Sequence, residues 1–291
     1  MSYITRFLLQ LAVALGVLEL LCRFGLGHKP TLKFDARYDR IPAPNESVVE
    51  ALEGFSRGRT NELGNLDSPM PTPLPPHAIL AMGDSLTEAR QVSQAERWTD
   101  RLSQLTGRRV YNTGHTGWSP VNALAYLQAE KQRFSAEQVV LQVSGNDISD
   151  LVAEKRPHVV FADGEFAVKL PKRKKSGVGA KINKFKELVS KSALGGNVIT
   201  AGLTMLGGGS DDGGNAQACS PPSAFQIMAS AWLLGKIKAE HNQTVILYLP
   251  VLDYYNGCYD KCAAAGELFR SAATATGLGF IDATKAMCAR F

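Results

Sequence analysis

From residue 77 onward, short apolar runs alternate with segments of helical periodicity. The apolar runs end at glycine or polar residues and predict buried strands at 77–82, 109–112, 138–143, 244–251 and 278–281. Apolar positions spaced by three or four residues predict helices at 95–105, 120–134, 224–241 and 260–275. Alternating strands and helices predict an α/β fold, in which a doubly wound parallel sheet forms the middle layer of a three-layer α/β/α sandwich.

The first 26 residues have a different pattern, dominated by the apolar stretch FLLQLAVALGVLELL at 7–21. Counted over 3–26, this segment reaches the roughly 20 residues needed to span a bilayer core of about 30 Å. The sequence LELLCR at its end lacks the small residues of a signal-peptidase site. We therefore expect residues 1–26 to be a signal anchor or transmembrane helix, with the rest exported to a periplasmic or extracellular space. A cleaved signal peptide and a buried core helix are the alternatives.

Residues 27–76 are rich in proline, glycine, asparagine and charge, and they end in SPMPTPLPPH. Such runs are extended and pack poorly, so we expect a Pro-rich tether between the membrane and a domain at 77–291. An insertion at about 152–220 separates the third strand from the next helix. It contains a Gly/Ser-rich stretch at 207–215, and loops of this length are usually lids or disordered inserts.

The charge of the chain is concentrated in that insertion. Between Lys169 and Lys191 there are nine basic residues and one acidic residue, a local charge of +8. The whole 291-residue chain carries +5, which leaves −3 for the remainder, so we expect no nucleic-acid partner. The basic run Lys172–Lys175 is interpreted either as a solvated face or as a contact for anionic lipid or an acidic polymer.

Five cysteines indicate an oxidising compartment. Cys22 lies at the predicted membrane edge, which leaves an even set of four: Cys219, Cys258, Cys262 and Cys288. Structural disulfides are the favoured interpretation, although the pairing does not follow from the sequence, and unpaired thiols are the alternative. The C-x₃-C spacing of GCYDKC lacks a second Cys/His pair, so we expect no metal site.

Polar turns that contain glycine follow each of the first three predicted strands. They read GDSL at 83–86, NTGHTGW at 112–118 and SGND at 144–147. Because the carboxyl ends of parallel strands meet at one edge of a sheet, these turns should lie close together. They would bring together a serine hydroxyl, backbone N–H groups and a carboxamide, which is the inventory for acyl transfer. Taken alone, the first turn is also explained as an ordinary helix N-cap.

These three blocks resemble the SGNH (GDSL) hydrolase family of esterases, lipases, thioesterases and carbohydrate deacetylases, over roughly 78–282. The resemblance implies a flavodoxin-like sandwich with no obligatory cofactor. It implies that Ser85 is the nucleophile and that the oxyanion hole consists of the Ser85 and Gly117 N–H groups and the Asn146 side chain. The activity it implies is that of a serine esterase, a carboxylic ester hydrolase or acyl-group transferase acting on a small-molecule or glycan ester.

The family's last block, D-x-x-H, supplies the general base and has no match here. None of the five histidines follows an acidic residue at that spacing. Three interpretations stay open: a fragment of a hydrolase, a protein that has lost catalysis and binds a carbohydrate or acyl ligand, or a base supplied by another histidine. His115 is the best candidate for such a base because its loop neighbours Gly117, although a surface loop histidine is the favoured interpretation.

Overall fold

A five-stranded parallel sheet forms the centre of the computed structural model, which describes residues 2–23, 28–51, 53–171, 192, 194–195, 198, 219–253 and 258–290. The strand order is β13-β10-β7-β5-β6, and every neighbouring pair is parallel. The strands are β5 (Ile79–Met82), β6 (Val110–Asn112), β7 (Gln138–Val143), β10 (Thr244–Tyr248) and β13 (Gly279–Asp282). Each overlaps its predicted strand, and the predicted and observed ends differ by at most three residues.

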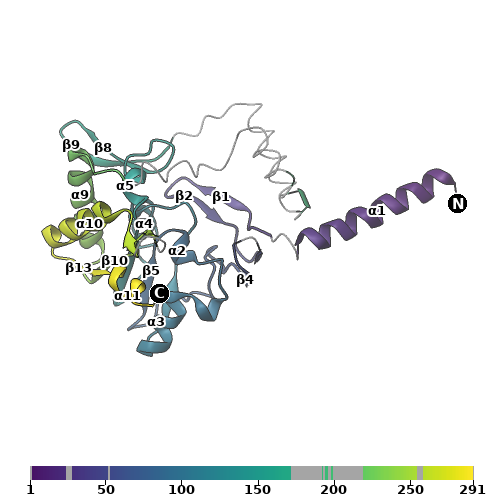
Figure 1. The fold of residues 1–291 in the computed structure, drawn as a ribbon, viewed down its shortest axis with the longest axis horizontal. Coiled ribbons are helices and arrows are strands. Elements are labelled where there is room, and N and C mark those ends of the chain that lie inside the picture. Colours follow the sequence, from purple (N-terminus) through teal and green to yellow (C-terminus); the bar gives the residue numbers. More distant parts are fainter. Residues whose placement is uncertain are drawn as a thin grey trace.

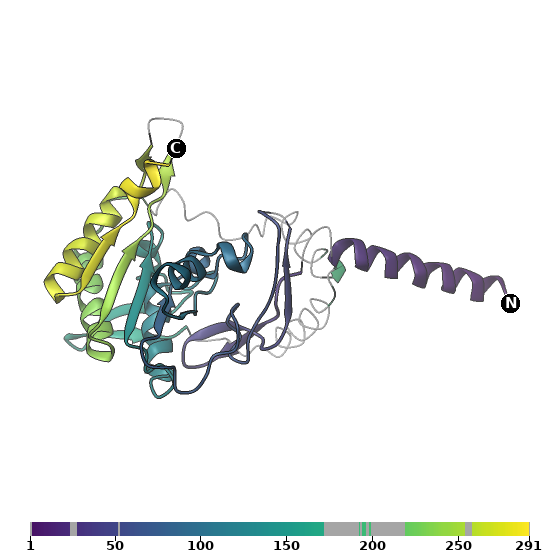
Figure 2. The same ribbon diagram turned by 90° about the horizontal axis from the view of Figure 1, so that it is seen from below.

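Helices cover both faces of this sheet (Figures 1 and 2). The described helices of this part of the chain are α2 (Ser85–Glu88), η2 (Gln94–Glu96), α3 (Trp98–Thr106), α4 (Pro120–Ala129), α5 (Asp147–Asp150), α9 (Ala224–Glu240), α10 (Ala263–Thr276) and α11 (Thr284–Cys288). Leu80 and Met82 of β5 belong to the large core shared with α4, α9 and α10. Ile79 and Ala81 point to the opposite face and pack near α3. The predicted α/β sandwich is confirmed.

The N-terminal helix α1 (Tyr3–Leu21) projects away from the sheet and its helices (Figure 1). It is 19 residues long, has a mean hydropathy of 1.8 and buries none of its residues. By length and composition this helix is able to cross a membrane, and a signal sequence at the same place would have the same properties. The alternative of a buried core helix is wrong.

The segment at 27–76 differs from the extended tether that we expected. It forms two antiparallel hairpins, β1 (Leu32–Asp35) with β2 (Asp39–Pro42) and β3 (Ser47–Glu50) with β4 (Ser56–Arg59). Trp118 Nε1 donates to the Arg40 carbonyl at 2.7 Å, and Asn122 Nδ2 donates to the Tyr38 carbonyl at 3.0 Å. Several side chains of the segment join the main core: Tyr38, Ile41, Met70 and Leu74. These four strands mix apolar with polar and charged residues and lack the apolar runs that predicted most of the sheet, and their packing partners come from distant loops. The domain boundaries themselves stay a prediction.

Leu74→Ala tests whether this segment contributes to the stability of the fold. Leu74 is 3% exposed and belongs to the core, so the substitution is expected to lower the free energy of unfolding by about 2–5 kcal/mol. Leu32→Ala, at a 54% exposed position of the same segment, is the matched control and should have little effect. Denaturant unfolding of both variants measures the difference. Equal small effects would mean that the segment is only a tether.

The described part of the insertion contains a hairpin of β8 (His158–Ala162) and β9 (Glu165–Lys169). Its turn residues Asp163 and Gly164 both have positive φ, 53° and 85°, as a tight hairpin turn requires. Phe166 of the hairpin lies 5.8 Å from Phe225 and 6.0 Å from Trp232, measured between ring centroids. The hairpin therefore packs on α9. The basic run Lys172–Lys175 and the Gly/Ser-rich stretch lie outside the described residues, so the expectation of a lid or disordered insert is not tested there.

Candidate active site

Three polar turns lie side by side at the carboxyl edge of the sheet. They follow β5, β6 and β7, and β5 lies between the other two strands. The strand register aligns Ala81 with Asn112 and Met82 with Leu141, so the three strands end at similar heights. The turns carrying Ser85, Gly117 and Asn146 are consequently neighbours, as the sequence predicted for the turns.

Ser85 is the first residue of α2 and is half-buried. Asp84 is the N-cap of this helix, and its Oδ1 accepts a hydrogen bond from the Leu86 N–H at 2.8 Å. Asp84, and not Ser85, is therefore the N-cap of α2. The Ser85 hydroxyl makes no hydrogen bond with another described residue. A side-chain oxygen without a structural partner on a strand-to-helix turn is available to a ligand.

The first turn needs glycine because a polar network crowds it. A Cβ at Gly83 would lie 2.4 Å from Thr87 Oγ1 and 2.5 Å from Gln142 Oε1. Gln142 Oε1 accepts from the Asp84 N–H at 3.3 Å and from the Thr87 hydroxyl at 2.9 Å. The backbone around Ser85 is thus tied to β7, which also leads into the third turn.

The second turn is tied to the first through backbone and side-chain contacts. The His115 N–H donates to the Gly83 carbonyl at 3.1 Å, and Asn112 Nδ2 donates to the Thr87 carbonyl at 2.6 Å. Gly117 has φ of +80° and is exposed, and a Cβ there would meet nothing within 4 Å. Its N–H forms no hydrogen bond with another described residue. A backbone donor therefore lies on the turn beside the one that carries Ser85.

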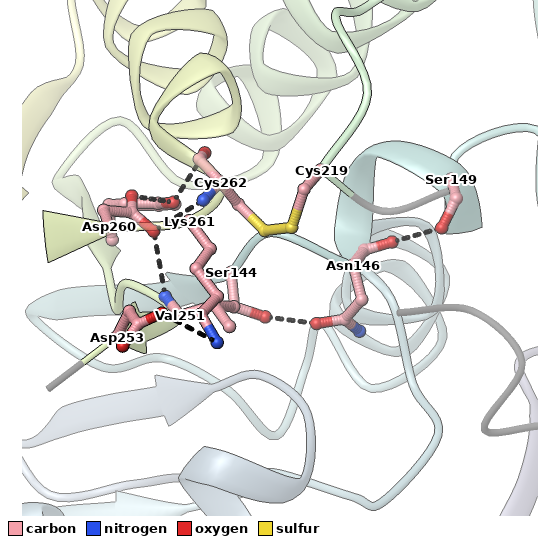
Figure 3. The surroundings of a disulfide bond; sticks show 10 residues. Ser144, Asn146, Ser149, Cys219, Val251, Asp253, Asp260, Lys261 and Cys262 are labelled. Carbon is pink, nitrogen blue, oxygen red and sulfur yellow. Dashed lines mark hydrogen bonds and ion pairs between the residues drawn. A yellow bond between two sulfur atoms is a disulfide. The ribbon is translucent and has the colours of Figure 1, made fainter. Parts of the chain in front are cut away.

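The third turn places Asn146 immediately before α5, with its side chain half-buried. Its Oδ1 accepts a hydrogen bond from the Ser144 hydroxyl at 2.6 Å (Figure 3). The Ser144 N–H donates to Asp147 Oδ2 at 2.7 Å, which closes the turn. Between them, Gly145 lies so close to Cys262 that a Cβ would be 2.6 Å from the Cys262 Cβ and 2.7 Å from its Sγ. The third turn is therefore held by a hydrogen bond to Asp147 and by close packing of Gly145 against Cys262.

Cys262 is part of a disulfide with Cys219, shown in Figure 3. The second disulfide joins Cys258 to Cys288. Disulfide bonding is confirmed, and the two cysteines of the C-x₃-C pair bond to other cysteines rather than to each other. Cys22 is buried and free. The described residues contain no group of three or more His, Cys, Asp or Glu side chains able to hold a metal ion.

Three carboxyl groups of the site are removed from water. Burial raises the pKa of Asp84 and of Asp147, and repulsion from Asp84 raises the pKa of Asp147 further. Burial also raises the pKa of Asp150, against the opposing effects of Arg156 and of the Asn146 amide. Asp150 and Arg156 form an ion pair at 2.7 Å. Asp84 and Asp147 are therefore protonated more readily than carboxyl groups in water, and Asp150 is held in an ion pair.

His115 does not have the surroundings of a general base. It is 2% exposed, and its Nε2 is 2.9 Å from Asn65 Oδ1. Its ring also packs edge-on against Trp118, with centroids 4.4 Å apart. Burial, followed by the charge of Arg90, lowers the pKa of His115 to about 3. An imidazole with this pKa is a poor proton acceptor at neutral pH, so the structure contradicts the interpretation of His115 as the base.

The remaining histidines also have other surroundings. His77 Nδ1 lies 2.6 Å from Glu137 Oε2. His158 Nδ1 lies 2.8 Å from the Arg156 carbonyl, and His241 Nε2 lies 2.8 Å from the Ala136 carbonyl. His28 forms a β-bridge with Val49. Within the described part of the chain, no histidine is hydrogen-bonded to Ser85. The partner that would accept the Ser85 proton is therefore not assigned.

This chain is similar to known proteins through one family and, more distantly, through solved structures. The GDSL-like Lipase/Acylhydrolase family matches residues 81–291. Among solved structures, TesA is 14% identical over 70% of this chain and 76% of its own, with a TM-score of 0.39. Esterase EstA from Pseudoalteromonas sp. is 14% identical, with coverages of 71% and 76% and a TM-score of 0.37. The lipase/acylhydrolase from Enterococcus faecalis is 13% identical, with coverages of 73% and 79% and a TM-score of 0.37.

No curated protein matches the chain. The family match nevertheless spans well over half of it and includes the turns that carry Ser85, Gly117 and Asn146. This chain belongs to the GDSL-like lipase/acylhydrolase family.

Proposed function

We propose that the protein is a serine ester hydrolase or acyl-group transferase in which Ser85 is the nucleophile. The observation that carries this proposal is the Ser85 hydroxyl, which begins α2 at the carboxyl edge of the sheet without a structural hydrogen bond. Family membership supports the same chemistry. Neighbouring turns add the Gly117 N–H and the Asn146 amide, donors of the kind that an ester oxyanion needs.

In the proposed reaction, Ser85 Oγ attacks the ester carbonyl carbon and its proton passes to a general base. The carbonyl oxygen becomes an oxyanion that accepts hydrogen bonds from the Ser85 N–H, the Gly117 N–H and Asn146 Nδ2. Collapse of this intermediate breaks the bond to the alcohol, which leaves with a proton, and forms an acyl-enzyme at Ser85. Water or a second alcohol then takes the acyl group and completes hydrolysis or transfer.

The proposed substrate is a small-molecule or glycan ester, and the reaction needs no cofactor. We also propose that α1 anchors the protein in a membrane with its α/β domain exported. The apolar, unburied α1 and the two disulfides support this location, since disulfides persist in oxidising compartments. The rival function is a non-catalytic carbohydrate- or acyl-binding module on the same fold.

Asn146→Ala tests the oxyanion hole. With p-nitrophenyl acetate as substrate, kcat is expected to fall by about 10²- to 10³-fold, as is typical when one oxyanion donor is removed. The fold should be retained, because Asn146 is half-buried and lies in a turn. Asn242→Ala, at an exposed turn asparagine, is the control and should keep the wild-type kcat.

Equal kcat in wild type and Asn146→Ala would contradict the assignment of Asn146 as an oxyanion donor. A wild-type chain that turns over no ester but still binds an acetylated oligosaccharide would favour the binding module. Titration calorimetry with that oligosaccharide separates this outcome from simple misfolding, because an unfolded chain would not bind.

A further inference from the structure

The Ser144 side chain lies between the proposed oxyanion donor and a buried carboxyl group. Ser144 is 1% exposed, and its hydroxyl is 2.6 Å from Asn146 Oδ1 and 3.3 Å from Asp84 Oδ2. Asp84 caps the helix that begins at Ser85. One hydroxyl thus connects the turn of the proposed nucleophile with the turn of the proposed donor.

The Ser144 hydroxyl donates to the Asn146 amide oxygen and thereby fixes the orientation of that amide. A serine hydroxyl has one proton to donate, and an amide oxygen can only accept. The short contact to Asn146 Oδ1 therefore uses the Ser144 proton, while the longer contact to Asp84 is the weaker one. With its oxygen held in this way, the amide has Nδ2 on the side away from Ser144 (Figure 3).

The backbone between the two residues has little freedom to relax. Gly145 separates Ser144 from Asn146 and packs against Cys262 of the Cys219–Cys262 disulfide. The Ser149 hydroxyl donates to the Asn146 main-chain carbonyl at 2.8 Å (Figure 3), and the Ser149 and Asp150 N–H groups donate to the same carbonyl at 3.1 and 3.2 Å. The backbone of Asn146 is therefore held without the Ser149 hydroxyl, whereas its side-chain oxygen is held by Ser144.

We propose that Ser144 is a positioning residue for ester cleavage, which holds Asn146 Oδ1 so that Nδ2 is presented to the oxyanion. This inference rests on the proposed function, because it concerns the donor of that reaction. Ser144 does not contact the substrate and acts only through Asn146. Its effect should appear where charge develops on the ester oxygen, in kcat rather than in KM.

Ser144→Ala is the test, with Ser149→Ala as the matched control. Loss of the Ser144 hydroxyl is expected to lower kcat for p-nitrophenyl acetate by about tenfold at unchanged KM, the effect of losing one buried hydrogen bond. Ser149→Ala removes a hydroxyl from the same turn and leaves the amide oriented, so its kcat should stay within about twofold. Ser144→Thr, which keeps a hydroxyl, should regain most of the activity, and thermal unfolding checks that each variant is folded.

A double-mutant cycle separates this inference from the proposed function. In an Asn146→Ala background, Ser144→Ala should cause no further loss, because no amide is left to orient. A tenfold loss in both backgrounds, or a Ser144→Ala variant as active as Ser149→Ala, overturns the role of Ser144 alone. An Asn146→Ala variant with wild-type kcat overturns the role of Asn146 and with it this inference, whereas the Ser85 nucleophile is tested separately by Ser85→Ala.

Discussion

Ser85→Ala is expected to abolish the pre-steady-state burst of p-nitrophenol from p-nitrophenyl acetate and to lower kcat by about 10⁴- to 10⁶-fold. Removing the nucleophile prevents the acyl-enzyme from forming, and only binding and oxyanion stabilisation are left. Because the hydroxyl has no structural hydrogen bond among the described residues, stability should change by less than about 0.5 kcal/mol. Stopped-flow absorbance measures the burst, and thermal unfolding measures the stability.

Ser93→Ala is a suitable control for that experiment. Ser93 is exposed, and it precedes η2 without a side-chain capping bond. The control should keep the burst amplitude of the wild type at one equivalent per enzyme. A full burst in Ser85→Ala would contradict the assignment of the nucleophile.

His115→Gln is expected to reduce the loss of stability that the wild type shows between pH 6.5 and 5. The pKa of His115 is lowered in the folded protein to about 3 from 6.5, so the unfolded chain takes up a proton that the folded chain does not. Stability therefore falls as the pH drops below 6.5, by roughly 1.4 kcal/mol per pH unit from this group. At pH 5 the contribution is about 2 kcal/mol, and glutamine removes it.

The measurement is denaturant unfolding of both proteins at several pH values from 7 to 5. Asn242→Gln is the control, since Asn242 is exposed and carries no titrating group, so its replacement should leave the pH slope unchanged. Parallel slopes in wild type and His115→Gln would show that the imidazole is not buried as a neutral group. That result would also restore His115 as a candidate for the general base.

The elements of the α/β core could be read from the sequence because their signals are local. The run HAILAM before Gly83 predicted a strand that the structure has at Ile79–Met82. The helix expected at 224–241 is present at Ala224–Glu240, with Ser223 and Gln226 forming its capping box. A buried strand and a capped helix depend mostly on residues within the same segment, so the pattern is sufficient.

The packed segment before the sheet, with its two hairpins, could not be predicted in the same way. Leu66, Met70 and Leu74 are each buried, but they are spaced irregularly among prolines and polar residues. Their burial depends on side chains that come later in the chain. Asn65 illustrates the point, because it lies in the expected tether and is 2.9 Å from the ring of His115. No periodic pattern in the sequence relates two residues that are 50 positions apart.

By itself, the sequence determined the class of fold, the succession along the chain of the sheet's five strands and its main helices, and which turns carry a hydroxyl, a backbone donor and a carboxamide. Those features are set by residue types at neighbouring positions, and parallel topology brings the turns to one edge. The tertiary structure alone decided that the Ser144 hydroxyl meets the Asn146 amide, that Cys262 bonds to Cys219, and that His115 is buried with a lowered pKa. Hydrogen bonds, disulfide pairing and desolvation depend on distances between atoms, and these exist only once the chain has folded.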